Sequence, residues 1–190
     1  NEIGWYENDG GTTPRFLQHV IATNLDHIKQ VYAADLDLDG DIDLFSASSG
    51  DGRIAWYEND GSADPTFVQH IVTDSARGAR GVSVADLDLD GDLDILAAAR
   101  EDGTVLWFAN QTIHRNARFL PLPNTFVANQ EAPRHVIAAD LDNDGDKDLI
   151  SIGNETLVWH ENDGRRPPGF AERMLDSDIA GGRWVEVADM

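Results

Sequence analysis

The chain has 190 residues, a formal charge of −21 at pH 7 and no cysteine. Such an acidic surface disfavours nucleic acid, whose phosphates require basic groups, and the lack of cysteine removes disulfides and thiolate metal sites. We therefore expect no nucleic-acid partner. No apolar run approaches the roughly 18 residues of a membrane span, so we expect no membrane span either.

Short apolar runs separated by turn residues predict an all-β chain built from repeated units. Residues 1–23 contain two expected strands, around WYEN and FLQHVI, which would form an outer half-unit. Residues 29–75 contain four expected strands, around VYAA, LFSAS, WYEN and FVQHIV. Residues 80–128 begin with VSVA and ILAAA, residues 134–176 contain VIAA, LISI, WHEN and FAERML, and residues 183–190 would start another unit.

An acidic loop follows the first expected strand of each complete unit and reads DLDLDGDID, DLDLDGDLD or DLDNDGDKD. Alternate side chains of a tightly curled loop converge on one side, and a glycine permits the sharp turn that wraps such oxygen ligands around one Ca²⁺. Positions one, three, five and nine would provide carboxylates, and position seven a backbone carbonyl. The predicted metal-binding residues are Asp35, Asp37, Asp39, Asp41 and Asp43, then Asp86, Asp88, Asp90, Asp92 and Asp94, and finally Asp140, Asp142, Asp144, Asp146 and Asp148.

An EF-hand begins with a similar pattern, but it requires a bidentate Glu at position twelve and a helix on each side. Position twelve here is Ser46, Ala97 or Ser151, and the flanking apolar runs are typical of strands. Solvated acidic turns without a metal are the alternative, but they would leave closely spaced carboxylates repelling one another. We therefore predict three Ca²⁺ sites, each in a loop between two strands.

A tryptophan recurs in step with these loops, in WYENDG, WYENDG, WFANQ and WHENDG. The spacings between Trp5, Trp56, Trp107 and Trp159 are 51, 51 and 52 residues, so the period is about 50. Four short antiparallel strands in a unit of this length predict a propeller blade. Because these tryptophans keep one phase, we expect them to pack between neighbouring blades rather than to stack on sugars.

The DxDxDGxxD loop, the WYEN strand and the repeat period together resemble the FG-GAP or VCBS repeats of bacterial surface and secreted proteins. The loop is also similar to those of the integrin α-subunit propeller. The resemblance covers essentially the whole chain and implies a calcium-stabilised β-propeller, typically of seven blades, in a secreted or cell-surface location. Such repeats serve as scaffolds, adhesins and lectin-like modules and also flank catalytic domains, so the resemblance does not imply an enzyme.

About three and a half blades are expected, and a propeller needs at least four complete ones to close. We therefore expect the remaining blades to come from a longer chain or from another subunit. An insertion at residues 114–133 follows the third tryptophan strand and is the expected specialised surface.

A basic residue stands six positions before the first aspartate of each loop, and the copies are Lys29, Arg80, Arg134 and Arg183. In a propeller this position begins the innermost strand, opposite the calcium loops, so the four bases would form part of a cationic ring. The next residue varies and is Trp184 in the last copy, the aromatic residue expected to be available for binding. Two interpretations stay open: a site for an anionic ligand such as an acidic glycan or a carboxylate-bearing partner, or ion pairs with neighbouring blades.

No serine shows a partner histidine and a glycine elbow, and the repeated carboxylates suit calcium better than acid–base catalysis, so we expect no enzyme. The leading hypothesis is a calcium-stabilised extracellular propeller for adhesion or recognition of a protein or carbohydrate ligand. A structural subunit of a self-assembling surface polymer or filament is one alternative, and an accessory propeller of a larger secreted enzyme is another.

Overall fold

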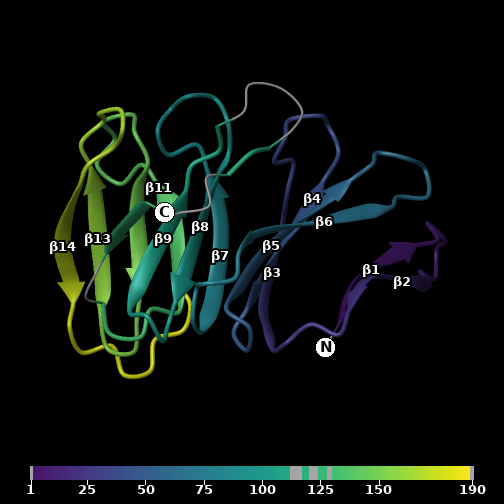
Figure 1. The fold of residues 1–190 in the computed structure, drawn as a ribbon, viewed down its shortest axis with the longest axis horizontal. Coiled ribbons are helices and arrows are strands. Elements are labelled where there is room, and N and C mark those ends of the chain that lie inside the picture. Colours follow the sequence, from purple (N-terminus) through teal and green to yellow (C-terminus); the bar gives the residue numbers. More distant parts are fainter. Residues whose placement is uncertain (1, 112–116, 120–123, 128–129, 189–190) are drawn as a thin grey trace.

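The computed structural model describes residues 2–111, 117–119, 124–127 and 130–188. These residues form fourteen strands in four antiparallel sheets and no helix (Figure 1). Among them there is accordingly no helix long and apolar enough to cross a membrane. The predicted all-β class is confirmed.

The sheets follow one another along the chain, and each is a simple meander of antiparallel neighbours. The N-terminal hairpin consists of β1 (Glu2–Asn8) and β2 (Phe16–Thr23). Sheet I consists of β3 (Ile28–Ala34), β4 (Asp43–Ser48), β5 (Arg53–Asn59) and β6 (Phe67–Thr73). Sheet II consists of β7 (Ala79–Ala85), β8 (Asp94–Ala99), β9 (Thr104–Phe108) and β10 (Asn124–Val127). Sheet III consists of β11 (His135–Ala139), β12 (Asp148–Ile152), β13 (Leu157–Asn162) and β14 (Phe170–Asp176).

Neighbouring sheets pack face to face, and the alternation of side chains along the second strands explains how. In β8, Ile95 and Ala97 belong to the core between sheets I and II, whereas Leu96 and Ala98 belong to the core between sheets II and III. Successive strand residues point to opposite faces, so an uninterrupted apolar strand buries both faces at once. Every residue of β8 is buried accordingly.

The recurring tryptophans occupy these two cores where a sheet follows them. Trp56 lies between sheets I and II and Trp107 between sheets II and III, and they are only 2% and 3% exposed. Their expected role between neighbouring sheets is thus confirmed. Trp5 and Trp159 are half-buried.

The first strands of the three sheets lie beside one another, with β7 between β3 and β11. Gln30 in β3 accepts a hydrogen bond from the Val82 N–H at 3.0 Å, and the Ser83 hydroxyl donates to the Val136 carbonyl at 2.8 Å. These bonds fix how the inner strands sit against one another.

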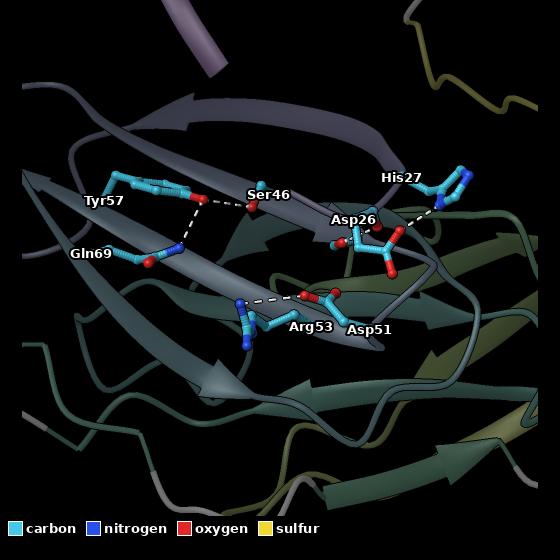
Figure 2. Close-up of polar contacts among 8 residues, drawn as sticks. Asp26, His27, Ser46, Asp51, Arg53, Tyr57 and Gln69 are labelled. Atoms are coloured by element: carbon cyan, nitrogen blue, oxygen red, sulfur yellow. Dashed lines mark hydrogen bonds and ion pairs between the residues drawn. The ribbon is translucent and has the colours of Figure 1, made fainter. Parts of the chain in front are cut away.

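A tyrosine hydroxyl ties three strands of sheet I together (Figure 2). The Tyr57 hydroxyl lies 3.4 Å from Oγ of Ser46 in β4 and accepts a hydrogen bond from Nε2 of Gln69 in β6 at 3.1 Å. Tyr57 is buried, so these partners satisfy a polar group that would otherwise be costly in the core.

The described strands do not close into a ring; their four sheets are compatible with propeller blades arranged side by side (Figure 1). Residues 183–188, where a further strand was expected, form no strand. Much of the predicted specialised surface at residues 114–133 lies outside the described residues, as does Asp189.

Gly81 provides a test of the close approach of β7 and β11. A Cβ at Gly81 would lie 2.8 Å from the Arg134 carbonyl oxygen, so the two backbones would have to separate. We expect Gly81→Ala to lower the free energy of unfolding by about 1–3 kcal/mol, as overpacking does. Gly11→Ala in the exposed turn of the N-terminal hairpin is the control in urea unfolding. Equal stability of the two variants would contradict the close approach.

Candidate functional site

The three acidic loops lie where the sequence predicts them, between the first and second strands of sheets I, II and III. The three loops have similar backbones. The glycines at position six have φ of 102°, 100° and 102° in Gly40, Gly91 and Gly145. Such left-handed angles suit glycine and confirm its expected role in the turn.

Each loop brings three carboxylates together at positions one, three and five. One oxygen from each lies within 4.8 Å of the other two. The three groups are Asp35, Asp37 and Asp39, then Asp86, Asp88 and Asp90, and finally Asp140, Asp142 and Asp144. Carboxylate oxygens at such separations are suited to one hard divalent cation.

Burial and mutual repulsion act on these carboxylates together. Burial is the larger cause and the charges of Asp39 and Asp43 the next, and they raise the pKa of Asp37 to about 6. In the third loop, burial and then the charges of Asp144 and Asp148 raise the pKa of Asp146 to about 6. The folded loops therefore resist holding all their negative charges unless a cation neutralises them.

The aspartates at position nine, Asp43, Asp94 and Asp148, are the most buried of each loop and lie outside the three grouped sets. Asp94 accepts the Asn110 N–H at 2.8 Å on one oxygen and the Leu87 N–H at 3.0 Å on the other. Asp43 and Asp148 repeat this pair of bonds with their own loops and tryptophan strands. The ninth aspartate, predicted as a ligand, thus also joins the loop to the third strand.

At position seven, whose backbone carbonyl was the predicted ligand, the side chains of Asp41 and Asp146 point to the hairpin after the tryptophan strand. The Asp41 carboxylate fills the space that a Cβ on Gly61 would take, and the Asp146 carboxylate lies near Gly164 in the same way. In the third loop, Oδ1 of Asp140 and Oδ1 of Asp146 are buried without a hydrogen-bond partner. A cation bound there would satisfy such oxygens, so the donor set fits Ca²⁺.

Four residues of the WYENDG motif make defined contacts in sheet I. Trp56 stacks on His70 at 4.6 Å between ring centroids, and Glu58 pairs with the same histidine at 2.7 Å. Asn59 donates from Nδ2 to the carbonyl of Ile42 at 3.0 Å. The following aspartate, Asp60, accepts two backbone N–H groups within its own turn.

The asparagine of this motif is the residue that the sequence analysis missed. Asn110 and Asn162 repeat the bond of Asn59, donating to the carbonyls of Leu93 and Lys147 at 3.2 and 3.0 Å. The signal was present, because an asparagine follows the tryptophan by three positions in every copy, including WFANQ, where other letters change.

Contrary to expectation, one serine does have a histidine partner. Oγ of Ser151 lies 2.8 Å from Nε2 of His160, and both residues are completely buried. Burial lowers the pKa of His160 to about 4. Ser46 and Tyr57 hold the same places in sheet I, and this repetition indicates a packing role.

At the other end of the inner strands, the four repeated bases meet. Lys29, Arg80, Arg134 and Arg183 line one cavity of about 140 Å³. Its remaining lining residues are Gln30, His135 and Trp184.

The environment of the basic cavity is cationic. Burial, followed by the charges of Arg100, Arg134 and Arg183, lowers the pKa of Arg80. Within the described part of the chain, none of the four lining bases forms an ion pair with a carboxylate. The alternative of ion pairs between neighbouring sheets therefore finds no support there.

The leucine at position four of the first loop provides a test of loop strain. Leu38 has φ of 57°, a left-handed angle that costs an ordinary residue about 1–2 kcal/mol, and its side chain is 54% exposed. We expect Leu38→Gly to raise the free energy of unfolding by about 1 kcal/mol. Ile42→Gly is the matched control, because Ile42 is equally exposed in the same loop without a positive φ, and this variant should lose stability. Loss of stability in both variants would argue against strain at Leu38.

The FG-GAP-like repeat family matches residues 35–97 and again residues 86–151. Each match begins at the first aspartate of one acidic loop and runs through the next loop. No curated protein sequence matched the chain. The two family matches overlap and together span more than half of the 190 residues, so the chain belongs to the FG-GAP-like repeat family.

Proposed function

We propose that the chain is a calcium-stabilised, non-catalytic β-propeller scaffold for extracellular adhesion or recognition. The observation that carries this proposal is the threefold occurrence of three carboxylates within 4.8 Å of one another, on loops of the same backbone shape. Repeats of this family often bind calcium and are typical of extracellular proteins. Loops of this kind require calcium on the order of 0.1 to 1 mM, a level found outside cells.

Calcium would stabilise each sheet at the loop that joins its first and second strands. The carboxylates at positions one, three and five would bind the ion. The backbone carbonyl at position seven and the carboxylate at position nine are the remaining candidate ligands. Because Asp94 also accepts N–H groups from its loop and from the third strand, ordering the loop would order both connections. A hard, oxygen-ligated ion of this kind has a structural effect and supplies no redox chemistry.

Removal of calcium should destabilise the fold strongly. At 1 mM calcium and a dissociation constant near 0.1 mM, each site contributes about 1.4 kcal/mol, or roughly 4 kcal/mol for three sites. We therefore expect chelator to lower Tm by about 10 °C. Asp39→Asn should reduce this difference by about a third, whereas Asp64→Asn, an exposed aspartate outside the loops, should not. Superimposable melting curves with calcium and with chelator would contradict the proposal.

The pH dependence provides an internal control for the same experiment. Burial raises the pKa of Asp94 from 3.8 to about 7, so in chelator the folded state holds more protons than the unfolded chain between those values. Stability in chelator should therefore rise as the pH falls from 7 towards 5. With calcium present, acidification should have the opposite effect, because the ion binds the deprotonated carboxylates.

Exposed apolar residues on the N-terminal hairpin and on sheet III favour assembly as a second candidate function. Tyr6 and Leu17 of the N-terminal hairpin are 61% and 62% exposed, and Met174 and Leu175 of sheet III are 59% and 51% exposed. Exposed patches of this kind are typical of surfaces that associate. Further blades, from the same longer chain or from another subunit, would cover these exposed residues.

Light scattering of the 190-residue chain in calcium tests this second candidate. We expect a dimer or larger particle whose mass grows with protein concentration, because covering the exposed residues buries apolar surface. Leu17→Lys combined with Met174→Lys should reduce the mass, whereas Val68→Lys, on an exposed valine of β6 outside the hairpin, sheet III and the acidic loops, should not. A monomer at every concentration would count against assembly and leave the recognition scaffold in place.

A further inference from the structure

The basic cavity at the start of the inner strands concentrates positive charge in a chain whose formal net charge is −21. The chain has 14 basic and 35 acidic residues, yet among the residues that the structure describes, four bases and no carboxylate line this one cavity. Each base comes from the same position of a different repeat, so the arrangement of the inner strands creates the cluster.

The described residues provide no ion pair that balances the charges in this cavity. None of its four bases pairs with a carboxylate within the described residues. Arg134 is held by neutral acceptors, Asn154 Oδ1 at 2.9 Å and the Gly182 carbonyl at 3.2 Å. A bound anion would relieve the repulsion among the guanidinium groups and gain charge-assisted hydrogen bonds.

An aromatic face stands beside these charges. The ring of Trp184 stacks on His135 with 3.8 Å between centroids, and the residue nevertheless remains 61% exposed. His135 is buried, so it holds the indole in place while leaving the other face of the indole accessible. A fixed aromatic face suits the apolar face of a pyranose ring.

We infer that this cavity binds the carboxylate of an acidic sugar, with the guanidinium groups of Arg80 and Arg134 on the carboxylate and Trp184 against the ring. Guanidinium forks match the planar carboxylate, and a cavity of about 140 Å³ admits the charged end of one sugar. Gln30 offers an amide at the rim for a hydroxyl, although its Oε1 already accepts the Val82 N–H. The inference rests on the proposed recognition function but uses no residue of the acidic loops.

Calorimetric titration of the chain in calcium with D-glucuronate tests this inference. D-Glucose controls for the sugar without the charge, and acetate controls for the charge without the ring. The variants are Arg80→Gln, which removes a guanidinium without a hydrogen bond or ion pair to any of the described residues, and Trp184→Ala. Arg165→Gln, in the exposed turn after β13, is the matched control for net charge.

The inference predicts that glucuronate binds and that glucose does not. Arg80→Gln should weaken glucuronate binding about tenfold or more, the effect of one charge-assisted hydrogen bond, without lowering Tm, because it removes a repelled charge. Trp184→Ala should weaken glucuronate binding and leave acetate binding unchanged. Arg165→Gln should behave like the unaltered chain.

Four outcomes would overturn the inference. Equal affinity for acetate and glucuronate would mean a simple anion site, and tighter binding of an aspartate-containing peptide would mean a site for protein carboxylates. A lower Tm of Arg80→Gln with unchanged binding would mean that the bases are structural. Calcium binding measured on the same samples keeps this result separate from the scaffold proposal, because absent sugar binding with intact calcium binding overturns only the inference.

Discussion

Electrostatic repulsion among the carboxylates of the three acidic loops opposes the turns that join the first two strands of each sheet. Each loop connects the first two strands of a sheet and brings three carboxylates within 4.8 Å of one another. The same loop is anchored by a buried aspartate, Asp94 in sheet II, that accepts N–H groups from the loop and from the tryptophan strand. The sheet cannot relax the loop without breaking these bonds, so a cation is the simplest means of neutralising it.

The two ends of each inner strand differ in charge. A base stands near the start of each and an acidic loop follows its end, and because β7 lies between β3 and β11, equal charges collect at each end. Repetition of one 50-residue unit thus creates two chemically different surfaces, a carboxylate end suited to calcium and a basic cavity suited to an anion. Between these ends, the apolar second strands and tryptophans hold the sheets together.

Much of this could be predicted from the sequence because the repeats sample the same environment several times. The loops, the tryptophan strands and the meeting of Lys29 with three arginines followed from spacing alone. The hydrogen bond of Asn59 to the Ile42 carbonyl and the stacking of Trp184 on His135 did not, since they depend on which segments face one another. The Ser151–His160 pair was missed for the same reason, because its two residues are diagonal neighbours on the adjacent strands β12 and β13.

An anomalous difference map from crystals grown with calcium shows whether each acidic loop holds a calcium ion. We expect a peak in each loop, about 2.3–2.6 Å from carboxylate oxygens at positions one, three and five. Three empty loops in an ordered, folded structure at millimolar calcium would contradict this expectation, because the repelling carboxylates would then be tolerated without an ion.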